Sequence, residues 1–336
     1  MSIPVIAFFN NKGGVGKTSL AYHLSWKFSE LDVKILAADL DPQANLSAAF
    51  LSEDRLEEIW IDGKGETIFT TLKPLIERSG VAAAPSLEKI TSNLSLIVGD
   101  IRLSDSEDMF SSEWPKCLDR DVGAFRVLSS FWTVLQKGAE ESNADLIIMD
   151  VGPNLGAINR AALIATDYVI IPVAPDLFSI QGLQNLGPTL KDWRRDWQER
   201  LQKKPNSFTD ALPEGKIAPM GYIVLQHGER LDRPVKAYQK WIEKLPAIFH
   251  DEVLIDKAIT TPDSIDTDPH CLAMLKHYRS LVPMAQQARK PVFQLKASDG
   301  AIGSHQNLVK KAGEDFQALA RTVADRIHLK MPSQEF

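Results

Sequence analysis

The hydrophobic residues of this 336-residue chain fall into short continuous runs, which alternate with longer amphipathic stretches. Continuous apolar runs are typical of parallel strands buried on both faces, and they occur at residues 3–9, 33–39, 95–99, 145–150, 168–173 and 220–226. Helical spacing places Leu20, Leu24 and Phe28 on one face, and residues 156–166 and 179–202 also have helical patterns. We therefore expect an α/β fold with a doubly wound, mostly parallel sheet flanked by helices. Its ligands should bind at the carboxyl ends of the strands.

Two stretches interrupt this alternation. Residues 52–140 read as helices and loops around the predicted strand at 95–99, and residues 200–216 contain the breakers Pro205, Pro213 and Gly215. The chain has no internal repeat and no low-complexity segment. We expect one domain over residues 1–330, with insertions at about 52–140 and 200–216, followed by a short tail at 331–336.

The first predicted strand leads directly into Asn-Asn-Lys-Gly-Gly-Val-Gly-Lys-Thr-Ser at residues 10–19. A glycine-rich turn between a strand and a helix binds nucleotide phosphates, because its N–H groups and the helix N-terminus converge on negative charge. Lys17 is predicted to reach the β- and γ-phosphates and the Thr18 hydroxyl to bind Mg²⁺. The predicted nucleotide-binding residues are Lys12, Gly13, Gly14, Val15, Gly16, Lys17, Thr18 and Ser19.

One position in this loop departs from the usual phosphate-loop pattern. Asn11 stands where that pattern has a glycine, and Lys12 follows it, so the loop carries a second lysine. A second cation is unexplained if one subunit binds one nucleotide through Lys17 alone. We therefore expect Lys12 to point outward, toward phosphates held by a facing subunit.

The segment Lys-Gly-Gly-Val-Gly-Lys-Thr at residues 12–18 resembles the deviant Walker A box of the ParA/MinD family of ATPases. Residues 36–45 resemble the switch I segment of that family, and residues 145–156 resemble its Walker B strand and switch II. The likeness continues through residues 168–173, 181–183, 289–293 and 312–316, so it covers almost the whole chain. It is ParA-like rather than MinD-like, chiefly through Asp41-Pro42-Gln43.

The resemblance implies a Mg²⁺-dependent ATPase that converts ATP to ADP and phosphate. It implies that Asp39 and Asp150 hold Mg²⁺ with Thr18, and that Asp41 orients the attacking water. Lys12 and Lys17 would neutralise charge during hydrolysis. Other interpretations exist for two of these residues: Asp41 before Pro42 could be a helix N-cap, and Asp150 could be a turn residue.

Adenine recognition has two candidates. Gln226 ends the predicted strand at 220–226, and its amide can both donate to and accept from a base. Pro283 is expected in the same pocket from its position relative to Lys290-Pro291. For both residues, an ordinary loop or core role is an equal alternative.

The family resemblance also implies partners. Lys12 would cross to a second copy in an ATP-dependent sandwich homodimer, with slow turnover until a ParB-like or cargo-adaptor protein stimulates it. Such dimers bind DNA without sequence preference. Basic residues that could contact DNA phosphates are Lys276, Arg279, Arg289 and Lys290. The alternative is a nucleotide-switched subunit that controls a protein partner without binding DNA, which the net charge of −6 favours.

The sequence argues against several classes of protein: membrane-spanning, secreted, disulfide-linked and zinc-binding. No apolar stretch approaches the roughly 18–20 residues of a membrane span, and the N-terminal end lacks the pattern of a secretory signal. Cys117 and Cys271 are isolated, which argues against a disulfide framework or a zinc site. We expect no membrane partner and a cytoplasmic protein, associated with the nucleoid if it binds DNA.

Overall fold

The computed structural model describes residues 2–226, 235–254, 262–276, 278 and 280–332. Within these residues the strands form one eight-stranded sheet in the order β3-β4-β2-β5-β1-β6-β7-β8. All neighbouring strands are parallel except β3 and β4, which pair antiparallel. The strands are β1 (Val5–Phe8), β2 (Ile35–Asp39), β3 (Glu88–Lys89), β4 (Leu94–Ile97), β5 (Leu146–Asp150), β6 (Tyr168–Val173), β7 (Ala218–Gln226) and β8 (Cys271–Lys276).

The helices cover both faces of this sheet. They are α1 (Lys17–Glu30), α2 (Asn45–Phe50), α3 (Glu53–Trp60), α4 (Ile68–Ile76), α5 (Glu107–Lys116), α6 (Val122–Leu128), α7 (Ser130–Ser142), α8 (Ala157–Ile164), α9 (Leu177–Gln202), α10 (Val235–Ile242), α11 (Leu245–Ile248), α12 (Val282–Ala288) and α13 (Ser304–Arg326). Short helical turns are η1 (Ile101–Ser106), η2 (Phe249–Val253), η3 (Ile265–Thr267), η4 (Val292–Gln294) and η5 (Ala297–Asp299).

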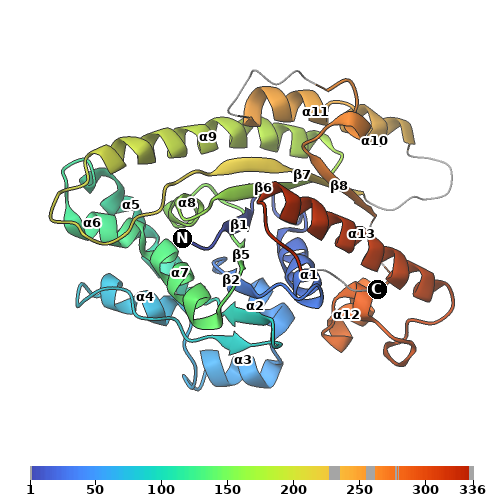
Figure 1. Ribbon diagram of the computed structural model, residues 1–336, viewed down its shortest axis with the longest axis horizontal. Helices are drawn as coiled ribbons and strands as arrows, with labels where there is room; N and C mark the ends of the chain where they lie inside the picture. Colours follow the sequence, from blue (N-terminus) through green and yellow to red (C-terminus); the bar gives the residue numbers. More distant parts are fainter. Residues whose placement is uncertain (1, 227–234, 255–261, 277, 279, 333–336) are drawn as a thin grey trace.

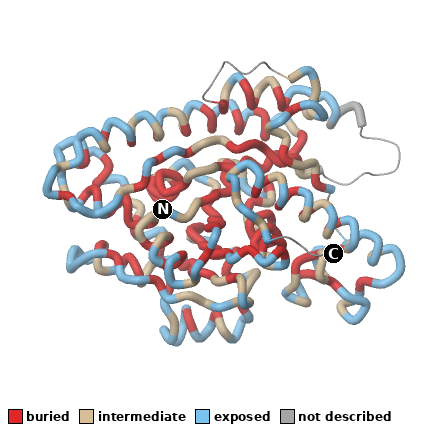
Figure 2. The backbone as a smooth tube through the Cα atoms, viewed as in Figure 1, coloured by how far each residue is buried: buried red, intermediate tan, exposed pale blue. Residues whose placement is uncertain are grey.

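Alternate residues of the strands other than β3 pack into two separate cores. On β1, Val5 and Ala7 pack with residues of α4 to α9 on one face, whereas Ile6 and Phe8 pack with residues of α1 to α3, α12 and α13 on the other. Figure 1 shows the long helix α9 and the C-terminal helix α13 on opposite sides of the sheet. In Figure 2 the buried residues are concentrated along the strands and on the inward sides of these helices. This arrangement is the doubly wound sheet that the apolar runs predict.

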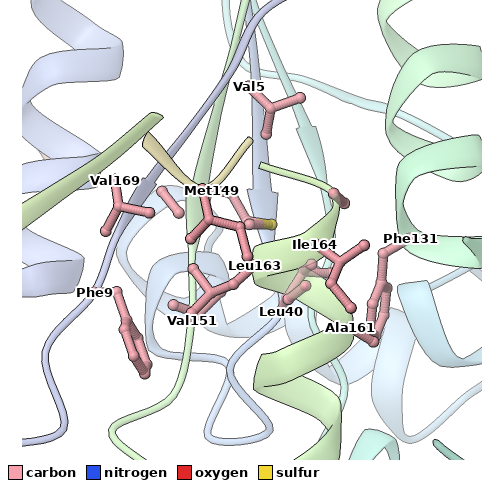
Figure 3. Packing of buried hydrophobic residues seen from close by; sticks show 14 of the residues in the cluster. Val5, Phe9, Leu40, Phe131, Met149, Val151, Ala161, Leu163, Ile164 and Val169 are labelled. Atoms are coloured by element: carbon pink, nitrogen blue, oxygen red, sulfur yellow. The ribbon is translucent and has the colours of Figure 1, made fainter. Parts of the chain in front are cut away.

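The core beneath α8 fixes the segment that follows β5. Figure 3 shows Ile164 of α8 beside Phe131 of α7, with Met149 of β5 close by. All three side chains are fully buried. Because protein interiors are close-packed, this contact holds α8 firmly against the sheet. The loop between β5 and α8 is thus anchored at both ends.

All six predicted strands are present, within a few residues of their predicted bounds. Leu20, Leu24 and Phe28 are buried on one face of α1, as their spacing predicts. Two strands at the edges of the sheet, β3 and β8, are not among those predicted. Residues 203–217 connect α9 to β7 without helix or strand. Among the described residues, no helix combines the length and the apolar character that crossing a membrane requires.

Candidate functional site

The phosphate loop connects β1 to α1 at the carboxyl edge of the sheet, where the central strand order places a ligand site. Gly14 and Gly16 have φ values of 73° and 80°, a left-handed conformation that favours glycine. A Cβ atom added to Gly13 or Gly14 would meet nothing within 4 Å, whereas one on Gly16 would lie 2.6 Å from Cδ1 of Leu225. The loop therefore opens outward at Gly13 and Gly14 and packs against the end of β7 at Gly16.

Lys17, the first residue of α1, bridges this loop. Its ammonium donates to the backbone oxygens of Asn10 at 3.1 Å and Lys12 at 3.4 Å. Burial lowers the pKa of Lys17, and the carboxyls of Asp150 and Asp41 oppose that shift. The ammonium thus lies inside the loop, where its charge faces the carboxyls at the ends of β2 and β5.

Lys12 has a different environment. Its ammonium lies 2.6 Å from Oδ2 of Asp176, and its side chain is about a third exposed, at 30%. The ring of Phe178, an exposed side chain, lies 5.7 Å from the same ammonium. The two lysines of the loop therefore point to different places: Lys17 inward and Lys12 to the surface beside α9.

Asp39 and Asp150 are paired residues at the ends of the adjacent strands β2 and β5. Both are fully buried. Neither oxygen of Asp150 has a hydrogen-bond partner of ordinary geometry. Burial, helped by the charge of Asp39, raises the pKa of Asp150 well above its ordinary value, while Thr18 and Lys17 oppose the rise. A buried carboxyl with unused acceptor oxygens beside the phosphate loop suits a ligand that supplies positive charge or donors.

Asp39 is already bound within the protein. Its Oδ2 accepts hydrogen bonds of 2.7 Å from both the backbone N–H and the hydroxyl of Ser47, the third residue of α2. The same Ser47 oxygen accepts from the N–H of Gly99 at 2.8 Å. Burial raises the pKa of Asp39 to about 7. Asp39 therefore anchors the start of α2 to the sheet, a contact that the sequence analysis did not foresee.

Asp41 lies in the segment that resembles switch I, close to the loop that follows β5. Its Oδ1 accepts from the N–H of Gln43 at 3.0 Å, and it would be 3.4 Å from a Cβ added to Gly152. The alternative interpretation of Asp41 as a helix N-cap is wrong, because α2 begins at Asn45 and its N-cap is Ala44. Its carboxyl is buried and faces the loop after β5, so it lies beside both Asp39 and that loop.

The loop after β5 is organised by a residue that the sequence analysis missed. The amide of Asn159 on α8 donates to the backbone oxygens of Gly152 at 2.9 Å and Asn154 at 2.7 Å. Asn10 has a similar function in the phosphate loop, where it donates to Pro172 and accepts from the N–H of Lys12. Such buried asparagines fix backbone turns by satisfying groups that regular structure leaves unpaired. Asn10 directly follows the predicted strand at 3–9, whereas Asn159 lies inside the predicted helix at 156–166, where no sequence motif marks it.

The described carboxylates, histidines and cysteines contain no group of three placed to hold a metal ion on their own. Mg²⁺ does not need such a group, since it keeps several waters and is usually held by one or two carboxylates with substrate phosphates. The unpartnered oxygens of Asp150 and the nearby Thr18 hydroxyl fit that donor set. Of the two carboxylates predicted for the metal, Asp150 therefore has the better placed oxygens.

The remaining residues predicted to bind the nucleotide lie on three different elements. Gln226 ends β7, next to Leu225, which packs on Gly16, but its side chain is outside the described residues. Pro283 is exposed in the first turn of α12. The Ser19 hydroxyl lies 3.3 Å from Nδ1 of His23. The nucleotide roles of these three residues remain predictions.

The candidate DNA contacts differ in their surroundings. Lys276 is exposed at the end of β8, and Arg279 lies outside the described residues. Arg289 is 3.7 Å from the carboxylate of Glu53, and the ammonium of Lys290 lies 2.9 Å from both oxygens of Asp299. Acidic partners thus offset the positive charge of Arg289 and Lys290.

A buried lysine and three carboxyls around an outward-opening glycine loop, at the carboxyl edge of a doubly wound sheet, define a P-loop nucleotide-binding protein. A family model described as an AAA domain matches residues 3–203. The chain belongs to this family and, within it, to the ParA/MinD group of P-loop ATPases.

Three known proteins illustrate the relationship. An uncharacterized protein of Methanocaldococcus jannaschii is 32% identical over 297 residues, which cover 88% of this chain and 93% of the relative. The sporulation initiation inhibitor protein Soj of Bacillus subtilis is 28% identical over 74% of this chain and 81% of its own length. A solved structure of Cyanothece McdA, an aspartate-to-alanine variant in complex with ATP, has a TM-score of 0.61 at 17% identity and covers 99% of both chains. This last likeness concerns the fold.

Proposed function

We propose that this protein is a Mg²⁺-dependent ATPase that forms an ATP-dependent sandwich dimer and uses ATP hydrolysis to partition or position DNA or another cargo. One observation carries the proposal: the phosphate loop holds Lys17 inward among carboxyls and Lys12 outward at the surface. A nucleotide site within one subunit needs only the inward lysine. The outward lysine is explained by a second subunit whose phosphates it reaches.

Hydrolysis at such a site consists mainly of positioning and charge neutralisation. The N–H groups of residues 13–18 would surround the phosphates, with the Lys17 ammonium on the β- and γ-phosphate oxygens. Thr18 and Asp150 would hold Mg²⁺, which when bound offsets phosphate charge. Asp41, buried beside Gly152, would orient the attacking water by accepting its hydrogen bond.

Slow intrinsic turnover follows from where Lys12 lies. In the single chain its ammonium is paired with Asp176, so it neutralises charge in its own subunit instead of at a partner's phosphates. A cation supplied in trans accelerates phosphoryl transfer greatly. We therefore expect slow hydrolysis by the monomer, faster hydrolysis by the dimer, and further stimulation by a ParB-like or cargo-adaptor protein.

DNA binding is the second part of the proposal. Non-specific binding requires lysines and arginines that contact backbone phosphates, and it weakens steeply with salt. Lys276, Arg279, Arg289 and Lys290 are the candidates, and a dimer would double their number. Such a protein would be found in the cytoplasm, associated with the nucleoid.

A second candidate function is a nucleotide switch that controls a protein partner without binding DNA. It is favoured by the ion pairs that Arg289 makes with Glu53 and Lys290 makes with Asp299, since paired cations attract phosphates less. The net charge of −6 also disfavours binding to DNA phosphates.

The test uses Asp41→Ala protein, which should bind ATP without hydrolysing it. Its mass in solution is measured with ATP and Mg²⁺ and with ADP, and the same samples are then mixed with DNA of arbitrary sequence at two salt concentrations. A dimer that forms only with ATP, and is lost when Lys12→Ala is added, supports the sandwich. Salt-sensitive DNA binding by that dimer supports a role in partitioning or positioning. A dimer that does not bind DNA supports the protein switch. A monomer with ATP contradicts the sandwich dimer and the role proposed for Lys12 in it.

A further inference from the structure

The N-terminus of α8, which directly follows the switch II loop, is capped by a side chain from a distant segment. The carboxylate of Glu107, the first residue of α5, accepts hydrogen bonds from the backbone N–H groups of Ala157 at 2.5 Å and Ile158 at 3.1 Å. These are the first two residues of α8, and their N–H groups have no partner within the helix. The residue that would ordinarily supply the cap is Gly156, which has no side chain to do so. The cap therefore comes from fifty residues earlier in the chain.

Gly156 provides the room for this contact. A Cβ atom at this position would lie 2.6 Å from Oε1 of Glu107 and 2.9 Å from Oδ1 of Asn154. The φ of Gly156 is −75°, which any residue can adopt. Its backbone conformation therefore does not require glycine. Glycine is required because the Glu107 carboxylate approaches this position too closely for a Cβ atom.

The position of α8 also affects the loop beside Asp41, the carboxyl that we propose orients the attacking water. Asn159, the third residue of α8, holds the backbone oxygens of Gly152 and Asn154. A Cβ atom added to Gly152 would lie 3.4 Å from Oδ1 of Asp41, so the loop passes close to that carboxylate. Hydrogen bonds thus connect Glu107 to α8 and Asn159 of α8 to the switch II loop, and that loop lies beside Asp41.

The helix that carries Glu107 is itself fixed. On α5, the ring of Trp114 has the guanidinium of Arg160 from α8 at 4.2 Å and that of Arg200 from α9 at 3.8 Å. Arg200 also donates from Nε to the backbone oxygen of Trp114 at 2.9 Å. Two cations on one buried ring orient α5 relative to both neighbouring helices, so the position of Glu107 does not depend on its own hydrogen bonds alone.

We propose that Glu107 is a positioning residue for switch II: it caps α8 and thereby holds the loop of residues 151–156 in the conformation that faces Asp41. This gives the segment around α5, part of the long insertion after α2, a role in the reaction. The effect on catalysis rests on the proposed ATPase function, whereas the effect on the loop does not.

The test compares Glu107→Ala, Glu107→Gln and Gly156→Ala, with Asp108→Ala as the matched control, because Asp108 is the exposed neighbour of Glu107 on α5. The first readout is amide hydrogen exchange of residues 151–158 without nucleotide. Loss of a helix cap should make local opening about tenfold more frequent. We expect this in Glu107→Ala and Gly156→Ala, partial recovery in Glu107→Gln, whose amide oxygen still accepts one N–H, and no change in the control.

The second readout is the kcat for ATP beside the Kd for a fluorescent ATP analogue. A positioning role predicts that Glu107→Ala lowers kcat about fivefold or more and changes the Kd by less than about twofold, since the phosphate loop is untouched. A merely structural defect would change both, together with the Tm.

The double variant Glu107→Ala/Gly156→Ala tests whether Gly156→Ala acts by displacing the Glu107 carboxylate. Gly156→Ala should displace the Glu107 carboxylate and also crowd Oδ1 of Asn154, so the double variant should be no worse than Gly156→Ala alone. Unchanged exchange in Glu107→Ala would overturn the proposal, and additive effects would overturn the part of it that assigns the effect of Gly156→Ala to Glu107 instead of Asn154. If the unmodified protein binds ATP without hydrolysing it, the ATPase proposal fails, and the exchange readout still decides whether Glu107 holds the loop.

Discussion

The ammonium of Lys12 lies 2.6 Å from a carboxylate oxygen of Asp176 in the same chain, although 164 residues separate them. Asp176 is also the N-cap of α9, because its Oδ1 accepts from the N–H of Ser179 at 2.8 Å. One carboxylate therefore both starts a helix and holds the outer lysine of the phosphate loop. If Lys12 reaches a partner's phosphates in the dimer, it must first leave Asp176.

This relationship predicts that Asp176→Asn favours the ATP-dependent dimer. Asparagine keeps the N-cap of α9 but no longer attracts the ammonium by charge. Both side chains are about a third exposed, at 30% and 35%, so the pair contributes at most about 1 kcal/mol. The dimer should form at a roughly threefold lower protein concentration, measured by sedimentation with ATP and Mg²⁺. Asp196→Asn, on the same helix, is the control, and weaker dimerisation of Asp176→Asn would contradict the prediction.

Ser47 offers a second test, at the start of α2. Its hydroxyl bridges Asp39 and the N–H of Gly99, and all of these groups are buried. Ser47→Ala leaves a buried N–H without an acceptor and removes one donor from Asp39. We expect the free energy of unfolding to fall by roughly 1–3 kcal/mol, measured by urea titration. Ser29→Ala, whose hydroxyl contacts Thr91 in a partly buried position, should cost less.

The glycines of the phosphate loop form a matched pair. Gly14 and Gly16 both have positive φ, but only at Gly16 would a Cβ meet a neighbour, Cδ1 of Leu225 at 2.6 Å. Gly14→Ala should therefore cost only the backbone strain, about 1–2 kcal/mol. Gly16→Ala should cost more, because overpacking against β7 adds to that strain. Equal losses in the free energy of unfolding for the two variants would show that the Leu225 side chain can move aside at little cost.

Most of the central fold could be predicted from the sequence because buried parallel strands are continuous apolar runs. The edge strand β8 could not, since Cys271–Lys276 is rich in alanine, leucine and methionine and only partly buried, and neither property favours strand recognition. The positions of the phosphate loop, Asp39, Asp41 and Asp150 could be predicted because each ends a strand or begins within two residues of its end; their roles remain predictions. Asp176 and Glu107 were not, because their partners are distant in the sequence and only the packing of α5, α8 and α9 brings them together.

His23 lies one turn beyond the phosphate loop and connects α1 to the C-terminal part of the chain. Its Nδ1 is 2.6 Å from the backbone oxygen of Ser19, its Nε2 accepts from the N–H of Val292 at 3.2 Å, and its ring stacks on Phe316. Both nitrogens are thus used by the neutral imidazole, with Nδ1 carrying the proton. Burial lowers the pKa of His23 to about 4, although the hydrogen bond to Ser19 opposes the shift.

A histidine with a lowered pKa in the folded state binds fewer protons there than in the unfolded chain between about pH 4 and 6.5. The free energy of unfolding should therefore fall as the pH drops through this window, by about 3 kcal/mol from His23 alone. His23→Gln, which does not titrate, should be less stable than the unmodified protein at pH 7 but lose less stability on acidification. Urea titrations at pH 7, 5.5 and 4 measure the difference in slope, and His305→Gln is the control for a less buried histidine. Parallel pH profiles for the unmodified protein and His23→Gln would show that His23 is not held neutral between Ser19 and Val292.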